Sequence, residues 1–139
     1  MKKRPRWFYN QSAVIPYRRT KSGIEILLVT SRGGKRWIIP KGIIDPGTTA
    51  LESARKEAYG EAGVSGPVGS TALGKYQYEK WGGTCTVKVF PMEVDSELDT
   101  WPEDSTRRRK WMSVKEVKKA IEEPDLNKLI RVFSETVKN

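Results

Sequence analysis

Two residue types that carry much of protein chemistry are absent or nearly absent. The sequence has no histidine and only one cysteine, Cys85. Without histidine the chain lacks the commonest general base, any Ser-His or Cys-His nucleophile pair, and the imidazole ligands of most catalytic zinc sites. A single cysteine cannot form an internal disulfide. Any chemistry therefore has to use carboxylates, cations, hydroxyl groups or a bound metal ion.

Long apolar runs are also missing. No stretch approaches the roughly 20 apolar residues that span a bilayer, and residues 1–11 lack the apolar run of a signal peptide. We therefore expect a soluble, cytoplasmic protein without a membrane partner. The length of 139 residues, with 37% hydrophobic and 31% charged residues, predicts a single globular domain over residues 1–139.

Positive charge is what the chain has in excess. Lysine and arginine number 26 against 17 aspartates and glutamates, so the formal net charge is +9. Such a charge attracts nucleic acid, anionic lipid or a polyphosphorylated small molecule, or it serves solubility alone. Nucleic acid is disfavoured, because the cations lie mainly in predicted loops and no predicted helix has a dense basic face.

Strand-like runs separated by glycine-containing turns predict two β-hairpins. Their strands are residues 12–17 with 24–30, and residues 68–78 with 84–93. Shorter strand-like pieces lie at 37–39 and 110–112. The glycines and prolines of 40–47 and the charged residues of 95–109 predict two long loops rather than strands.

Capping residues and apolar spacing predict three helices. The first begins at Thr48 or Thr49 and ends at Gly63. Ser113 and Glu116 have capping-box spacing and open a second helix that runs to about residue 121. Pro124 interrupts that helix, and residues 126–137 form a closing helix.

Two glutamates on the first predicted helix are the best candidates for chemistry. At about 100° per residue, Glu57 and Glu61 lie about 40° apart and one turn from each other, at the border of the apolar stripe. Two such carboxylates repel each other unless a cation lies between them, although a solvated helix edge can also carry this spacing. Hard oxygen ligands with open positions suit Mg²⁺ or Mn²⁺.

The segment around these glutamates resembles the Nudix box. That pattern is Gly, five residues of any kind, Glu, seven of any kind, then Arg-Glu-aliphatic-any-Glu-Glu-any-Gly-aliphatic. On residues 42–64 the matching positions are Gly42, Glu57, Glu61, Gly63 and Val64, with Lys56 and Ala58 as near matches. Residues 37–42 before the box and Asp45-Pro-Gly47 inside it are also typical of the family. Residues 98–111 resemble the diphosphoinositol polyphosphate phosphohydrolase branch.

Two box positions depart from the pattern. Thr48 stands where the first glutamate of the box would be, a residue that braces the loop in relatives. Gly60 stands where relatives have a metal ligand or proposed general base. The site is therefore one carboxylate short. Either an acid outside the box completes the site or activity has been lost, and the candidate acids are Glu93, Asp95, Glu97, Glu103 and Asp104.

The resemblance implies an α/β fold, an α/β/α sandwich with a mixed β-sheet, and metal-dependent hydrolysis of a phosphoanhydride bond. Glu57 and Glu61 would be metal ligands, either one also accepting a proton, and the backbone carbonyl of Lys41 would be a further ligand to Mg²⁺ or Mn²⁺. A diphosphoinositol polyphosphate or a dinucleoside polyphosphate is the expected substrate. The alternative is a catalytically silent Nudix-fold module that binds a nucleotide or polyanion, because Gly60 replaces a box glutamate.

Basic and aromatic residues complete the set of candidates. Arginine binds phosphate through two-point contacts and lysine through a point charge. The candidate substrate-binding residues are Ser31, Arg32, Lys35, Arg36, Lys41, Lys80, Arg107 and Arg109. Several aromatic residues could stack a nucleobase, although aromatic side chains beside strands more often serve packing. These are Trp7, Tyr9, Tyr76, Tyr78 and Trp81.

Overall fold

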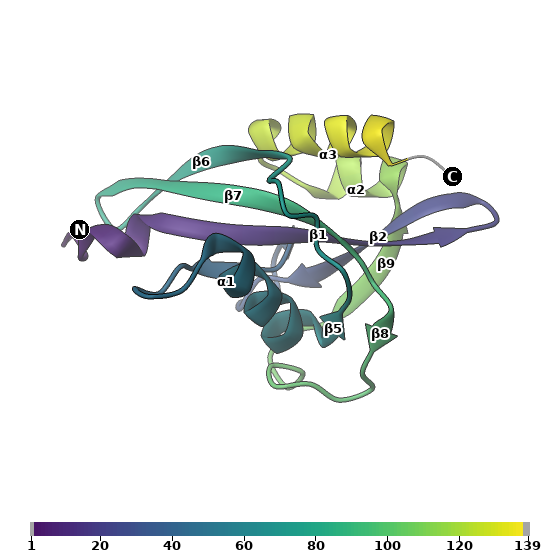
Figure 1. Ribbon diagram of the computed structural model, residues 1–139, viewed down its shortest axis with the longest axis horizontal. Helices are drawn as coiled ribbons and strands as arrows, with labels where there is room; N and C mark the ends of the chain where they lie inside the picture. Colours follow the sequence, from purple (N-terminus) through teal and green to yellow (C-terminus); the bar gives the residue numbers. More distant parts are fainter. Residues whose placement is uncertain (1, 138–139) are drawn as a thin grey trace.

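A seven-stranded mixed sheet with helices on both faces forms the centre of the computed structural model, which describes residues 2–137 (Figure 1). The main path runs β3-β2-β1-β7-β6, while β4 pairs with β1 and β9 pairs with β2. The strands are β1 (Asn10–Thr20), β2 (Gly23–Thr30), β3 (Trp37–Ile38), β4 (Lys41–Ile43), β6 (Gly74–Lys80), β7 (Gly83–Glu93) and β9 (Arg109–Ser113).

Both predicted hairpins are present. Strands β1 and β2 pair antiparallel with Tyr17 opposite Ile26, and β6 and β7 pair antiparallel with Tyr76 opposite Val87. Strand β1 runs parallel to β7, with Val14 opposite Phe90, and this one parallel pair makes the sheet mixed. The first strand of the second hairpin begins at Gly74, later than the predicted residue 68.

Helices cover the two faces of the sheet unequally (Figure 1). Helix α1 (Ala50–Glu57), continued by the turn η2 (Ala58–Ala62), packs on one face. Helices α2 (Val114–Ala120) and α3 (Pro124–Thr136) pack on the other, where Leu126, Ile130 and Phe133 enter the larger of two apolar cores. The predicted α/β/α sandwich with a mixed sheet is confirmed.

Local signals place the helix ends. Thr49 caps α1 in a reciprocal box with Glu52, and Ser113 caps α2 in the same way with Glu116. Proline at the first position of α3 lacks the N–H that a helix start leaves unbonded, so Pro124 begins that helix. No helix among residues 2–137 is long and apolar enough to cross a membrane.

Two predicted loops contain short strands. Residues 40–47 were expected to be a loop throughout. Instead, Lys41–Ile43 forms β4, which pairs antiparallel with β1. Within 95–109, Ser96–Glu97 forms β8 and pairs with β5 (Val64–Ser65). Both predictions were wrong at these residues because pairing with a distant segment supplies hydrogen bonds that local composition does not reveal.

The first predicted helix changes character in its last turn. Residues 58–62 form a π-helical turn, and Gly63 ends it in the left-handed conformation with φ 67°. Isolated π turns are uncommon and occur often at functional sites. This turn carries Gly60 and Glu61, so the irregular segment is the one that the sequence singled out for chemistry.

Candidate active site

One pocket of about 630 Å³ brings the two box glutamates together with cations from other elements. It lies beside α1 and η2, and residues of β1, β3, β4, β6 and the segments that connect the helices and strands supply its other walls. The three glutamates that line it are Glu57, Glu61 and Glu103. The remaining lining residues are Gln11, Arg32, Ile38, Lys41, Gly42, Ile43, Asp45, Lys56, Tyr78, Lys80, Trp81 and Arg107.

Glu57 is placed by the backbone of β4. A Cβ atom at Gly42 would overlap the Glu57 carboxyl group, so only glycine leaves room for that side chain. Burial raises the pKa of Glu57, while a hydrogen bond with Glu61 works in the opposite direction. The box glycine thus serves as a recess for the first box carboxylate.

Glu61 is almost completely buried, with 5% of its surface exposed. One carboxyl oxygen accepts a hydrogen bond from the Lys41 backbone N–H at 3.2 Å, and the other lies 3.5 Å from the Arg107 guanidinium. Burial raises the pKa of Glu61 to about 8, against the opposing effect of Arg107 and with a further increase from Glu57. Two adjacent carboxyl groups of raised pKa favour a bound proton or cation between them.

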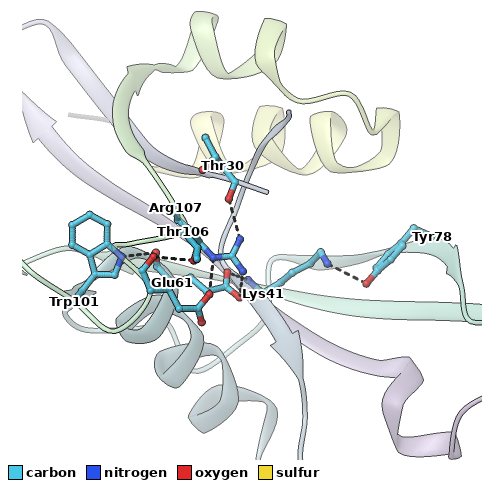
Figure 2. Close-up of polar contacts among 8 residues, drawn as sticks. Thr30, Lys41, Glu61, Tyr78, Trp101, Thr106 and Arg107 are labelled. Carbon is cyan, nitrogen blue, oxygen red and sulfur yellow. Dashed lines mark hydrogen bonds and ion pairs between the residues drawn. The ribbon is translucent and has the colours of Figure 1, made fainter. Parts of the chain in front are cut away.

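Arg107 joins the site to the sheet (Figure 2). This buried guanidinium donates to the Thr30 carbonyl at 2.9 Å and to a Glu103 carboxyl oxygen at 2.8 Å, besides its ion pair with Glu61. Arg107 therefore compensates the buried Glu61 and the half-buried Glu103, and it holds the loop that carries Glu103 against β2.

The loop between β8 and β9 closes the end of the box helix. The last four carbonyls of a helix lack partners inside it. Here the carbonyls of residues 60–63 each accept a hydrogen bond from a residue between Leu98 and Arg109. The pairs are Glu103 N–H to Gly60, Trp101 Nε1–H to Glu61 at 2.9 Å, Arg109 to Ala62 at 2.7 Å, and Leu98 N–H to Gly63. Figure 2 shows Trp101 reaching Glu61. These bonds place Glu103 beside the π turn.

Glu103 lies beside Gly60, the box position at which relatives have a glutamate. A Cβ atom at Gly60 would lie 3.8 Å from a Glu103 carboxyl oxygen. The other candidate acids are engaged elsewhere or lie outside the pocket: Glu93 pairs with Arg19, Glu97 pairs with Arg109, and Asp104 accepts from the Trp101 N–H. Asp95 does not line the pocket either. Among the predicted outside acids, the structure brings only Glu103 to the box carboxylates.

The candidate substrate-binding residues divide into two groups. Arg32, Lys41, Lys80 and Arg107 line the pocket, and the Lys41 ammonium donates to the Tyr78 hydroxyl at 3.1 Å (Figure 2). Burial and the nearby Lys80 lower the pKa of Lys41. The second group lies outside the pocket lining and consists of Ser31, Lys35, Arg36 and Arg109.

Structural contacts account for most of that second group. Arg36 lies 3.6 Å from Glu123 beside α3, and Ser31 accepts from the Arg36 N–H. Arg109 packs its guanidinium 3.9 Å from the centre of the Trp101 ring. Thr48, at the other departure from the box, donates to the Asp45 carbonyl at 2.7 Å and so braces the loop itself.

Gln11 lines the pocket and was not singled out by sequence, whereas Asp45 and Lys56 were named only as parts of the box. Gln11 accepts from the Tyr78 hydroxyl at 2.7 Å, and both residues line the pocket. Both residues lie on strands at positions with ordinary strand composition. Asp45 lies 3.4 Å from Lys56 across the box loop. Both residues lie within the box, so their positions in that motif were the sequence pattern that could have identified them.

The fold is an α/β/α sandwich, and one pocket in it is lined by carboxylates together with lysines and arginines. Such a pocket suits an anionic ligand that carries a metal ion. A model of the NUDIX domain matches residues 9–133, and the chain therefore belongs to the Nudix family.

Relatives of known name agree with this membership. Nudix hydrolase 21 of Arabidopsis thaliana is 37% identical over 108 residues, which cover 73% of this chain and 54% of the relative. Diphosphoinositol polyphosphate phosphohydrolase 3-alpha of Mus musculus is 31% identical over 121 residues, covering 85% and 72%. The chain spans about three fifths of the length of the plant relatives, such as 63% of Nudix hydrolase 13.

Solved structures show the same fold. The Ap4A hydrolase of C. elegans superposes with a TM-score of 0.78 at 23% identity, covering 92% of this chain and 97% of that one. A Nudix hydrolase from Nitrosomonas europaea gives a TM-score of 0.74 at 20% identity, covering 94% and 90%.

Proposed function

We propose that this chain hydrolyses a phosphoanhydride bond in a polyphosphorylated small molecule, with a divalent cation, Mg²⁺ or Mn²⁺, held by its pocket carboxylates. The observation that carries the proposal is the arrangement of Glu57, Glu61 and Glu103 along one pocket that also contains Arg32, Lys41 and Lys80. Acidic and basic side chains in one pocket suit a metal-associated polyphosphate, because the cation and the phosphates each find opposite charge.

The donor set fits a hard divalent cation. Glu57 and Glu61 are adjacent, partly or fully buried, and both have raised pKa values, so a cation would relieve their repulsion. Among residues 2–137 no three acidic or cysteine side chains already converge at metal-binding spacing. The Glu103 side chain is 30% exposed, which leaves it room to turn towards the pair. The Lys41 carbonyl is the proposed backbone ligand.

The charged residues of the pocket have different roles in the proposed reaction. A divalent cation held by Glu57, Glu61 and Glu103 would polarise phosphoryl oxygens and lower the pKa of water. Arg32, Lys41 and Lys80 bind and orient the phosphate groups. Glu61 or Glu57 accepts the proton from the attacking water, and Arg107 keeps Glu61 and Glu103 in place during that transfer.

The substrate classes follow from the relatives. The mouse relative is named as a phosphohydrolase of diphosphoinositol polyphosphates, and the C. elegans structure as an Ap4A hydrolase. Similarity to the first supports an inositol pyrophosphate. A dinucleoside polyphosphate fits the same chemistry, because both substrates present a phosphoanhydride in a strongly anionic molecule.

The test is release of phosphate or nucleotide with Mg²⁺ and with Mn²⁺ across diphosphoinositol polyphosphates, diadenosine polyphosphates, ADP-ribose and nucleoside triphosphates. Turnover of any of these substrates that EDTA abolishes supports the proposal. Tight binding without turnover would replace it with the silent binding module, which the glycine at position 60 favours.

A further inference from the structure

Ser12 has a buried hydroxyl group without a partner. The residue lies on β1 with none of its surface exposed, and its Oγ atom has no hydrogen-bond partner among residues 2–137. A hydroxyl group buried without a hydrogen bond costs stability, and alanine would fill the same place without that cost. The serine at this position therefore points to a role that packing alone does not explain.

The side chain of Ser12 lies on the α1 face of the sheet. Successive side chains of a strand point to opposite faces. On β1, Ala13 belongs to the core under α2 and α3, whereas Val14 belongs to the core under α1. Ser12 lies two residues before Val14 and so shares its face, on which α1 packs (Figure 1). The buried hydroxyl group is therefore on the side of the sheet that faces the helix of Glu57.

The pairing of β1 with β4 brings Ser12 to the recess that holds the Glu57 carboxyl group. Ser12 lies directly opposite Gly42 in this antiparallel pair. Side chains at two such positions point to the same face, with their Cβ atoms about 5 Å apart. A Cβ atom at Gly42 would overlap the carboxyl carbon of Glu57 and one of its oxygens. The Glu57 carboxyl group thus takes the place of the side chain that would face Ser12.

The two box glutamates differ in their hydrogen-bond donors. Glu61 accepts from the Lys41 N–H and pairs with Arg107. Among the described residues, the Glu57 carboxyl group has a hydrogen bond only with Glu61. A carboxylate that binds a metal ion only accepts hydrogen bonds, so Glu61 as a second ligand cannot donate to Glu57. Glu57 then needs a donor, and Ser12 has an unused O–H group on the same face.

We propose that Ser12 is a positioning residue for Glu57: its hydroxyl group donates to one carboxylate oxygen from the sheet side and directs the other oxygen into the pocket. Rotation about the Cα–Cβ bond moves a serine hydroxyl between its staggered positions, so this bond needs no movement of the backbone. The inference rests on the proposed function, in which Glu57 is a metal ligand. Ser12 does not line the pocket and therefore acts through Glu57.

Ser53 provides a matched control on the same face. It lies on α1 one turn before Glu57, is 4% exposed, and donates from its hydroxyl group to the Ile43 carbonyl at 3.0 Å. Alanine at either serine removes one hydroxyl group from between α1 and the sheet. Ser53→Ala breaks an existing hydrogen bond, whereas Ser12→Ala removes an unpartnered group, so the two variants should differ in stability.

Two measurements test the inference together: Mn²⁺ affinity by calorimetry, and the melting temperature in EDTA. Ser12→Ala should raise the Kd for Mn²⁺ about 10-fold, the lower end for a residue that orients a metal ligand. Its melting temperature should stay unchanged or rise, because an unpartnered buried group is lost. Ser53→Ala should show the reverse pattern, with a lower melting temperature and a Kd for Mn²⁺ close to that of the wild type.

An unchanged Kd for Mn²⁺ in Ser12→Ala would overturn the positioning role and leave the proposed hydrolase function intact. Weaker Mn²⁺ binding together with a lower melting temperature would also overturn it, because general loosening of the α1 face gives that result. No binding of Mn²⁺ to the wild type would overturn it too, and turnover then decides the hydrolase function separately. If no substrate is turned over but Ser12→Ala shows the expected pair of results, the hydrolase function fails and the role of Ser12 stands.

Discussion

The two faces of the sheet are built for different purposes. Under α2 and α3 the core contains large side chains, among them Phe133, Ile130 and Leu126. Under α1 and η2 the helix contributes alanines, Ala54, Ala58 and Ala62. Small residues let the helix approach the sheet closely, which brings Glu61 and Arg107 into the interior.

Charge separates the two faces as well. The buried charged residues of the described chain are Glu61 and Arg107, and both belong to the α1 side. Burying charge costs stability unless each group is paired and hydrogen-bonded. We infer that the apolar core under α2 and α3 stabilises the fold enough for the α1 face to bury Glu61 and Arg107, which costs stability but is useful for chemistry.

The largest expected effect comes from neutralising a carboxylate on the α1 face. Glu61→Gln keeps the size of the side chain and removes its charge, so kcat should fall about 100-fold or more, and Mg²⁺ affinity should fall too. The matched control is Glu135→Gln on the exposed surface of α3, which should leave both unchanged. Equal turnover in the Glu61 and Glu135 variants would refute the role of Glu61.

Arg107→Met and Phe133→Ala sharpen the comparison between the faces. The first leaves two carboxylates without their cation, and the second leaves a cavity, so each should lower stability by about 3–5 kcal/mol. Thermal unfolding measures this loss. Only Arg107→Met should also lower kcat, because Arg107 lines the pocket whereas Phe133 lies in the apolar core on the other face of the sheet. A stable, fully active Arg107→Met protein would contradict the structural role of Arg107.

The pH dependence of stability without metal gives a third contrast. The folded-state pKa of Glu61 is about 8, above its ordinary value of 4.5, so the folded protein holds that proton more tightly than the unfolded chain. The stabilisation is present below about pH 4.5 and is lost as pH rises through about 8. In EDTA, the melting temperature should therefore fall between pH 5.5 and 8.5.

Because the chain has no histidine, few other groups titrate between pH 5.5 and 8.5, so the change in melting temperature can be assigned to Glu61 more directly. Glu61→Gln should flatten the pH profile, and saturating Mg²⁺ should do the same in the wild type. An identical slope in the variant would assign the effect to another group.

The smallest expected effect is at the glycine of the π turn. The added methyl group of Gly60→Ala meets only the Glu103 carboxyl, at 3.8 Å, which is ordinary contact. Alanine in place of a helical glycine should stabilise the protein by up to about 1 kcal/mol. Urea unfolding measures it, and a loss of stability would show that the π turn requires glycine.

Local sequence patterns predict the elements of both faces well. The capping boxes at Thr49 and Ser113 and the turn before Gly23 act over a few residues, so the helix starts and the first hairpin could be predicted. Spacing along one helix likewise brought Glu57 and Glu61 to the same pocket. These signals need no knowledge of distant segments.

Contacts between distant segments explain what the sequence left open. Strand β4 exists because β1 offers it a partner, and Arg107 turns inward because Thr30 and Glu61 lie beside it. Glu103 was one of five candidate acids, and its place depends on hydrogen bonds between its loop and residues 60–63. No local pattern distinguishes it from Glu97 or Asp104.

Glu103 is proposed to supply the carboxylate that the box lacks at Gly60. Mg²⁺-dependent turnover and Mn²⁺ affinity should be measured for Glu103→Gln, for Glu97→Gln as the matched control, and for Gly60→Glu combined with Glu103→Gln. We predict that Glu103→Gln lowers turnover and Mn²⁺ affinity at least 10-fold each, roughly the lower end for a proton-transfer or ligand residue. Glu97→Gln should have little effect on either quantity. The double variant should recover much of the loss. Unchanged turnover and Mn²⁺ affinity in Glu103→Gln would contradict the claim.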